Sequence, residues 1–289
     1  MRKLKKKFKY YLSEKNPVLL TKLMYIVNFR RRLNLNNPKD INEKLHYLKL
    51  YTYCDNDVIT RCVDKYRVKE YLGEKNILGL KVANNYTEGM KMGAELLEVW
   101  DGLPDKFMIK CNHGCGFNLM VKDKKSENPN ELAEIIDKWL QDDQWKMYCE
   151  PQYKNVEKCF FVEEFLGEDV EAYKFYCFNG EPKVSYVSSA GDTGIQDLYL
   201  DFYDMDWKWL DISLDGHKNM GDKIKKPENY SLMIEIARKL SAEFPFVRVD
   251  LYDVDDKVYF SELTFVPTGG NMKLTPKSVL EEWGKMLEL

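Results

Sequence analysis

Histidine is scarce in this chain of 289 residues, and long apolar runs are absent. His46, His113 and His217 stand far apart, so the sequence offers no Ser-His-Asp arrangement. The longest apolar stretch near the N-terminus, PVLLTKLMYIVNF, contains Lys22 and falls short of the roughly 20 apolar residues of a membrane-spanning helix. An unbroken apolar segment followed by a small-residue cleavage site is also missing, so we expect no signal peptide.

The sequence lacks a cysteine pattern typical of disulfides or zinc. Its seven cysteines are odd in number and stand in apolar or strand-like contexts, which indicates reduced thiols in a cytoplasmic protein. Cys111 and Cys115 are spaced like half of a metal site, but no second Cys or His pair completes a tetrahedron. Internal repeats and low-complexity segments are absent as well.

The chain has no excess of positive charge, since 44 Lys and Arg residues stand against 47 Asp and Glu residues. This balance argues against a nucleic-acid-binding protein. It hides an asymmetry, because residues 1–32 carry eleven basic side chains and one acid, Glu14. The arm of residues 1–32 is therefore +10, the remaining residues are −13, and an asymmetry of this kind often reports a partner.

Helical periodicity dominates the first quarter of the chain, and short strand-like runs dominate the rest. Apolar spacing predicts helices over residues 3–12, 16–32, 42–50, 64–75, 129–146, 231–243 and 276–288. The dipeptide Asn179-Gly180, between two apolar runs, predicts a tight hairpin. Helices followed by mixed strands and helices predict an α+β (mixed α/β) enzyme, and the length predicts about two domains or lobes.

The segment FMIKCNHGCGFNLMVKD combines a strand, a Gly-rich turn and a second strand. Lys110 supplies positive charge, and Gly114 and Gly116 allow backbone N–H groups to approach phosphate oxygens closely. The spacing departs from the dinucleotide fingerprint at Leu119 and is not a Walker A loop. The segment is either a phosphate-binding loop or an ordinary Gly-rich hairpin.

Two further segments carry acids next to apolar strands. In VEEFLGED, residues 162–169, extended backbone is suited to bonding an adenine edge while an acid bonds ribose hydroxyls; a solvated strand end is the alternative. In VRVDLYDVDDKVYFSELTF, a three-residue loop of Asp255, Asp256 and Lys257 would place Asp250 opposite Glu262. A two-residue loop would separate them.

Facing carboxylates destabilise a sheet unless something neutralises them. Mg²⁺ does so, because it is typically held by one or two carboxylates together with substrate phosphates. The alternative is two acids on a partly wet face. Arg248 and Lys273 flank this hairpin and are candidates for binding an anionic substrate, and Lys174 either reaches a phosphate or points to solvent.

The order of these segments resembles the ATP-grasp superfamily and, more narrowly, the TupA-like ATP-grasp family of surface-polysaccharide (teichuronopeptide) biosynthesis. The resemblance runs from about Pro38 to the C-terminus. It rests on the blocks PKDINEKLHYLKLY, VDKYRVKEYL, LPDKFMIKCNHGCGFNLMVKD, EPQYKNVEKCFFVEEFL, YKFYCFNGEPK, FVRVDLYDVDDKVYFSELTFVPTGG and WGKMLEL.

The resemblance implies an ATP-grasp fold, with two lobes and ATP between them, preceded by an N-terminal helical region. We expect the basic helical region at 1–59, the small lobe with the Gly-rich loop and hinge at 60–166, and the large lobe with the metal-binding hairpin at 167–289. In this fold Lys65 and Lys110 match the two nucleotide lysines, and Arg248 joins them as a catalytic candidate.

The resemblance also implies the nucleotide and metal ligands. The expected ATP-binding residues are Lys65, Lys110, the phosphate loop His113, Gly114, Cys115, Gly116 and Phe117, the adenine hinge Glu163, Glu164, Phe165 and Leu166, the ribose acid Glu171, and Lys174. The expected Mg²⁺ ligands are Asp250, Glu262 and Thr264. Thr264 stands where the family usually has Asn, and Ala172 stands where an acid is expected.

The family characteristically phosphorylates a carboxylate and lets an amine attack the acyl phosphate. We therefore expect a carboxylate–amine ligase acting on a uronic acid of a cell-surface glycan and an amino acid or amine. The alternatives are a phosphotransferase, a glycosyltransferase and a nucleotide-binding scaffold without turnover. The arm of residues 1–32 is expected either to contact the inner face of the membrane or to be a disordered or crystal-ordered tail. In both cases we expect it to be dispensable for ATP binding.

Overall fold

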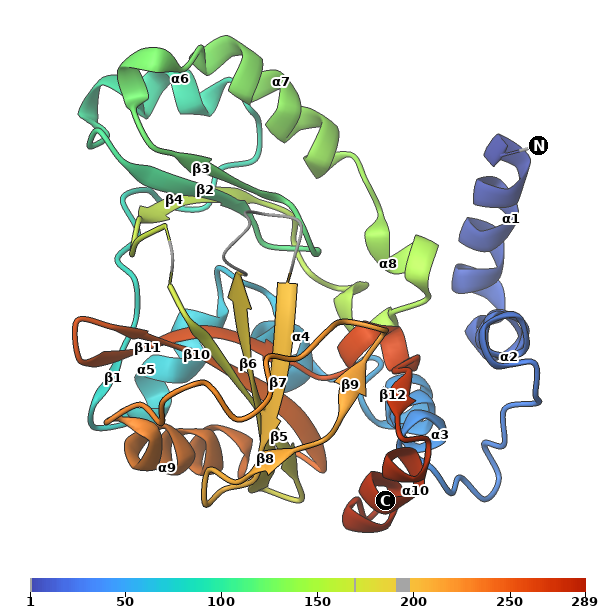
Figure 1. Cartoon of the computed structure of the whole chain (residues 1–289). Coiled ribbons are helices and arrows are strands. Elements are labelled where there is room, and N and C mark those ends of the chain that lie inside the picture. The colour runs from blue at the N-terminus through green and yellow to red at the C-terminus, as the bar shows by residue number, and fades with distance from the viewer. Residues whose placement is uncertain (1, 169, 191–197) are drawn as a thin grey trace. The chain divides into compact units, whose positions relative to one another are not determined.

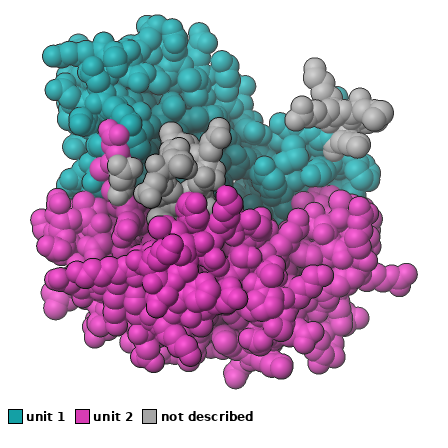
Figure 2. Space-filling view, viewed as in Figure 1, with its two compact units in different colours: residues 1–17, 53–74, 82–166 teal, residues 18–52, 75–81, 167–289 magenta. Residues whose placement is uncertain are grey.

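The structure is a computed structural model that describes residues 2–168, 170–190 and 198–289 (Figure 1). The chain divides into two compact units (Figure 2). Unit 1 comprises residues 1–17, 53–74 and 82–166, and unit 2 comprises residues 18–52, 75–81 and 167–289. The units therefore interleave along the sequence, and the domain boundaries expected above stay a prediction. Among the described residues, no helix is both long and apolar enough to cross a membrane.

Unit 1 is built on a three-stranded antiparallel sheet in the order β3-β2-β4. Its strands are β2 (Phe107–Cys111), β3 (Asn118–Val121) and β4 (Phe160–Glu164). Every second residue of β2 is buried, beginning with Phe107, and these residues pack with apolar residues of α7 (Pro129–Leu140), including Leu132 and Ile136. The other helices of the unit are α1 (Arg2–Lys15), α4 (Asp57–Val63), α5 (Val68–Lys75), α6 (Glu95–Val99) and α8 (Gln144–Tyr148).

Unit 2 is built on a seven-stranded sheet in the order β1-β11-β10-β5-β6-β7-β8. The strands are β1 (Leu80–Lys81), β5 (Ala172–Phe178), β6 (Glu181–Ala190), β7 (Leu198–Tyr203), β8 (Trp209–Leu210), β10 (Phe246–Val254) and β11 (Lys257–Thr264). The pair β1–β11 is parallel and the other neighbours are antiparallel. Helix α9 (Tyr230–Ser241) packs on β5, β6 and β10. The expected hairpin at Asn179-Gly180 is confirmed, and both of its turn residues have positive φ.

The remaining elements of unit 2 include the two-stranded sheet of β9 (Ser213–Leu214) and β12 (Leu274–Thr275). The helices are α2 (Pro17–Phe29), α3 (Ile41–Tyr47) and α10 (Ser278–Met286), and a π-helical turn, Leu48–Thr52, continues α3. Helix α3 contacts both α10 and the turn Pro267–Gly270.

One expected helix, residues 129–146, is two helices in the structure. Helix α7 ends at Leu140, and α8 begins at Gln144. Lys158 explains the break, because its ammonium binds the carbonyls of Leu140 at 3.1 Å and Asp142 at 2.9 Å and the carboxylate of Asp143 at 2.6 Å. A cation at the C-terminal carbonyls stabilises a helix end. The sequence-based prediction of one helix was wrong here, since this cation lies 18 residues downstream of Leu140.

The basic arm of residues 1–32 is not a separable tail. Helix α1 packs against α8 in unit 1, where Tyr10 donates to Asp142 at 3.0 Å and Lys146 pairs with Glu14. The later part of the arm supplies the buried Tyr25 and the ion-paired Arg31 to unit 2. Cutting the chain after residue 32 would therefore remove packing from both units.

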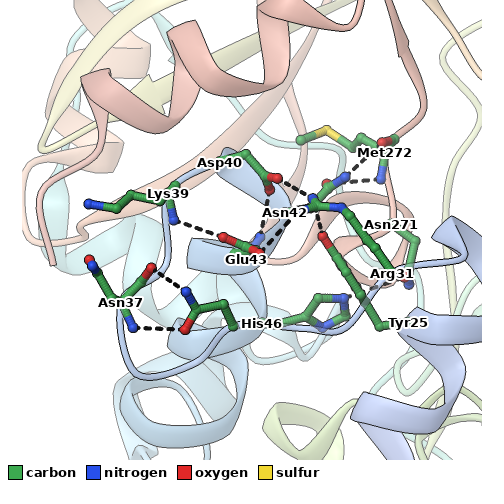
Figure 3. A network of polar contacts seen from close by, with 11 residues as sticks. Tyr25, Arg31, Asn37, Lys39, Asp40, Asn42, Glu43, His46, Asn271 and Met272 are labelled. Atoms are coloured by element: carbon green, nitrogen blue, oxygen red, sulfur yellow. Dashed lines mark hydrogen bonds and ion pairs between the residues drawn. The ribbon is translucent and has the colours of Figure 1, made fainter.

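Arg31 joins α2 to α3 through a polar network (Figure 3). Its guanidinium binds Asp40, the hydroxyl of Tyr25 and, at 3.1 Å, Glu43. On the same helix, Asn42 exchanges two hydrogen bonds with the backbone of Met272, at 2.8 and 3.1 Å. Residues near the start of the chain thereby hold the segment that follows β11.

Candidate active site

Asp250 and Glu262 are direct partners across β10 and β11, as predicted, but the reasoning behind that prediction was wrong. The turn has two residues, Asp255 and Asp256, both with positive φ, so Val254 pairs with Lys257. A two-residue turn alone would misalign the acids. The register shifts between Asp250 and Leu251, which leaves Ser261 as an extra residue and restores the pairing.

Asp250 is fully buried between two cations. The guanidinium of Arg248 donates from Nε to Oδ1 at 2.6 Å and from Nη2 to Oδ2 at 2.7 Å, and the ammonium of Lys174 also binds Oδ2. Burial alone would raise the pKa of Asp250, but the charges of Arg248 and Lys174 outweigh it, so the pKa of Asp250 lies below its usual range. The carboxylate is therefore ionised at neutral pH and anchors two buried cations.

The register places these side chains in one row. Lys174 on β5 pairs with Asp250 on β10, which pairs with Glu262 on β11. Arg248 lies opposite Thr264 and donates to its hydroxyl at 3.0 Å. Two cations, two acids and one hydroxyl thus line one face of three neighbouring strands.

The residues of this row fit one Mg²⁺ ion. A carboxylate offers about four lone pairs. Asp250 accepts three hydrogen bonds, which leaves one lone pair for a metal. Glu262 lies directly across the ladder. Within the described part of the chain, no three His, Cys, Asp or Glu side chains form a metal cage. An ion here would therefore complete its shell with water and phosphate oxygens, as Mg²⁺ usually does.

A second polar cluster lies in unit 1, around the buried carboxylate of Glu163. Lys110 on β2 pairs with one oxygen of Glu163, and Lys69 on α5 lies 3.2 Å from the other. Lys69 also donates to the carbonyl of Ala83 at 2.6 Å, and burial lowers its pKa more than Glu163 raises it. Two lysines share one acid, so the cluster keeps one net positive charge that suits a phosphate. The sequence interpretation missed Lys69, although it stands one helical turn after Lys65.

Lys65 extends from a turn that Asp64 organises. The carboxylate of Asp64 accepts the backbone N–H groups of Tyr66 at 2.9 Å and Arg67 at 3.0 Å, so Asp64 caps the turn that leads into α5. The ammonium of Lys65 donates to the carbonyl of Gly114 at 2.7 Å. The expected nucleotide lysine therefore touches the Gly-rich loop of its own unit.

The Gly-rich loop is anchored at both ends. His113 and Phe117 are buried side by side, with ring centroids 5.4 Å apart, so their side chains point into the core of unit 1 and only their backbones remain for a ligand. Nε2 of His113 lies 3.0 Å from the carbonyl of Trp139 and must carry the proton, since a carbonyl only accepts. Burial lowers the pKa of His113 to about 4.

The tip of the loop is exposed, and Gln144 holds it. The side-chain amide of Gln144 accepts the N–H of Cys115 and donates to its carbonyl, both at 2.9 Å. Gly116, with φ +76°, provides the left-handed residue that the turn requires. Gly114, Cys115 and Gly116 stay the predicted phosphate-binding residues, and Gln144 is a positioning residue that the sequence pattern did not reveal.

The predicted hinge residues differ in their surroundings. Glu164 accepts the backbone and side-chain N–H groups of Asn84, at 3.1 and 2.9 Å, while Phe165 and Leu166 are half-buried. Glu171 binds the hydroxyl of Tyr173 at 2.5 Å. Glu171, Tyr173 and Asp253 line a cavity of about 430 Å³.

Strand alternation separates this cavity from the Asp250 row. Tyr173 and Asp253 alternate with Lys174 and Asp250, so they belong to the sheet face that packs on α9. Glu171 lies with them, which weakens its assignment as the ribose acid.

Comparison with known proteins gives one family. A family model described as TupA-like ATPgrasp matches residues 43–288. A search of curated proteins finds no match.

Three solved structures are among those to which the chain is similar. An L-amino acid ligase from Bacillus licheniformis is 13% identical with a TM-score of 0.48, covering 86% of this chain and 55% of that one. A D-alanine-D-alanine ligase from Helicobacter pylori is 17% identical with a TM-score of 0.45, covering 87% and 70%. An N5-carboxyaminoimidazole synthase from Aspergillus clavatus, in complex with ADP, is 15% identical with a TM-score of 0.44, covering 72% and 45%. The chain spans about half the length of the first of these and of the third.

Proposed function

The chain belongs to the TupA-like ATP-grasp family, and we propose that it is an ATP-dependent carboxylate–amine ligase. We propose further that the carboxylate is a uronic acid of a cell-surface polysaccharide and that the amine belongs to an amino acid or amino sugar. The observation that carries the proposal is the row of Lys174, Asp250 and Glu262 across three strands, with Arg248 beside it. This row offers fixed positive charge and a single Mg²⁺ position, as phosphoryl transfer requires.

The proposed reaction has two steps. An oxygen of the acceptor carboxylate attacks the γ-phosphorus of ATP, the bond from that phosphorus to the β–γ bridging oxygen breaks, and ADP leaves. The amine nitrogen then attacks the carbonyl carbon of the acyl phosphate, the carbon–oxygen bond to phosphate breaks, and the nitrogen loses a proton. Inorganic phosphate and an amide are the products. No side-chain nucleophile is needed, which agrees with a sequence that lacks a catalytic triad.

The side chains of the chain contribute charge and position. Arg248 and Lys174 stay protonated because Asp250 raises the pKa of each above what burial alone would leave. In the proposal they bind the oxygens of the transferred phosphoryl group. Within unit 1, Lys110, Lys65 and Lys69 are separate candidates for binding phosphate oxygens. Mg²⁺, when held by Asp250 and Glu262, would neutralise phosphate charge.

A scaffold without turnover is the second candidate, and one observation favours it. Two cations and their hydrogen bonds already neutralise Asp250, and Thr264, which stands in the third ligand position, accepts a hydrogen bond from Arg248. In this arrangement the charge of Asp250 is balanced without a metal. A phosphotransferase or glycosyltransferase has no such specific observation in its favour.

We propose a cytoplasmic location, where ATP is available and thiols stay reduced. None of the seven cysteines, all of which lie among the described residues, forms a disulfide, which supports this proposal.

Hydroxylamine trapping tests the ligase proposal. The protein is incubated with ATP, Mg²⁺, hydroxylamine and a panel of uronates, and ADP and hydroxamate are measured by mass spectrometry. We expect both products to require a carboxylate and to fall at least about a hundredfold in Glu262→Gln. The matched control is Glu235→Gln, an exposed acid on α9, which should retain full activity. ATP binding with no turnover of any uronate in the unaltered protein would favour the scaffold, and binding of UDP-sugars without ATP would overturn both.

A further inference from the structure

Helix α2 exposes an apolar stripe. Leu19, Leu23, Ile26 and Val27 follow helical spacing along one face, and each residue is 41–67% exposed. The opposite face is buried, with Leu20 at 3%, Thr21 at 1% and Tyr25 at 0%. The helix is therefore held firmly in unit 2 while its outer face stays uncovered. A contiguous apolar patch of this kind marks an interaction site more often than scattered exposed residues do.

The stripe has a basic border. Lys22, Arg30 and Arg32 are exposed, and the sequence from Lys15 to Lys39 contains no acid. Helix α2 ends at Phe29, and the next residue, Arg30, has a positive φ. Arg31 and Arg32 follow it directly in the sequence. Arg31 is engaged with Asp40 and Glu43, so it belongs to the fold and not to this border.

We propose that this face of α2, defined by the apolar residues Leu19, Leu23, Ile26 and Val27 with the basic border of Lys22, Arg30 and Arg32, docks on an anionic membrane surface. An interfacial helix lies in the plane of the bilayer, with apolar residues among the acyl chains and basic residues at the lipid phosphates. The long Lys and Arg side chains can reach the headgroups while their stems cover the stripe. The inference does not depend on the proposed ligase activity.

Charge favours a bilayer over a second copy of the chain. In a symmetric dimer through this face, the border of one copy would meet the same cations of the other, and such like charges repel. The phosphates of a nucleic acid would pair with the cations but leave the aliphatic stripe exposed to solvent. Anionic lipid satisfies both. In unit 1, helix α1 also carries two exposed aromatic residues, Phe8 and Tyr11, among lysines.

Vesicle co-sedimentation of the full chain tests the proposal. Vesicles of phosphatidylcholine with about one third phosphatidylserine are compared with phosphatidylcholine alone, at low and high salt. We expect binding to the anionic vesicles, weakened by salt. The double variant Leu23→Glu and Ile26→Glu should lower the partition coefficient about tenfold or more, because it places charge in the apolar layer.

Matched controls separate the surface from general effects. The control pair Leu78→Glu and Leu97→Glu makes the same change at exposed leucines of 88% and 41% exposure, and should bind like the unaltered protein. Replacing the basic border residues Lys22, Arg30 and Arg32 by glutamine should lower the partition coefficient on anionic vesicles roughly fivefold per residue. The control for this triple variant replaces three exposed lysines elsewhere: Lys183, Lys239 and Lys277.

The outcomes divide cleanly. Loss of vesicle binding in the α2 variants but not in their controls supports the proposal. Equal binding of the stripe variant and its control, or equal binding to neutral and anionic vesicles, overturns it. A dimer in analytical ultracentrifugation that the stripe variant dissociates, without any vesicle binding, would show that a second copy covers this face and would also overturn it. Circular dichroism confirms that each variant is folded.

Discussion

Replacing Asp250 by Asn should destabilise unit 2 strongly while leaving its shape nearly unchanged. The side chains of Asp and Asn have almost the same volume, so the change removes charge and not packing. In the structure the carboxylate accepts bonds from Arg248 and Lys174, and all three groups are largely buried. The variant leaves two buried cations with a neutral amide, one end of which is itself a donor.

The magnitude follows from the cost of an uncompensated buried charge. Removing one partner of a buried ion pair costs about 3–5 kcal/mol. Equilibrium urea unfolding followed by tryptophan fluorescence measures this loss as a lower midpoint. The control Asp211→Asn, at an exposed position of the same unit, should change the free energy of unfolding by less than about 0.5 kcal/mol.

The pH dependence gives a second test of the same reasoning. The pKa of Asp250 lies below its unfolded value, so its contribution is fully present above about pH 4 and is lost as the pH falls through the lowered pKa. The variant should therefore lose stability at neutral pH and show a flatter acid limb. An unchanged urea midpoint would refute the assignment of Asp250 as counter-ion.

Three other changes test other parts of the structure. His113 stays neutral when folded, with its pKa lowered to about 4, so the protein should lose up to about 3 kcal/mol of stability between pH 6.5 and pH 4, and His113→Asn should remove that slope in urea titrations. Gln144→Ala should release the tip of the Gly-rich loop, with amide hydrogen exchange at Cys115 about tenfold faster and the global midpoint unchanged. Gly270→Ala should lower the free energy of unfolding by about 1–3 kcal/mol, because φ is +81° and the new Cβ would lie 3.1–3.3 Å from the ring of His46.

The sequence predicted local elements well because their signals are local. Helical spacing and the Asn179-Gly180 turn depend on neighbours within a few residues. The predicted pairing of Asp250 with Glu262 was correct, but the three-residue turn on which it rested was not. The turn has two residues, and the bulge at Ser261, which the sequence did not indicate, restores the pairing.

Features set by distant contacts escaped prediction. Lys158 ends α7 from beyond the helix, and Gln144 holds a loop 29 residues away. Lys69 looked like an ordinary helix residue until the fold brought Glu163 next to it. The interleaving of the units was equally invisible, because no composition change marks residues 52 or 74.

That interleaving has a consequence for how the protein is made. Asn42 finds its partner at Met272, which is 230 residues further along the chain, so α3 leaves the ribosome long before its binding surface exists. Three apolar residues of this segment are fully buried in the folded protein: Ile41, Leu45 and Leu48. They stay exposed to solvent until the C-terminal segment has been synthesised. Contacts of such separation are slow to form, and exposed apolar surface promotes aggregation while they are missing. We therefore expect the nascent chain to depend on chaperones until its last strands and helix have been synthesised.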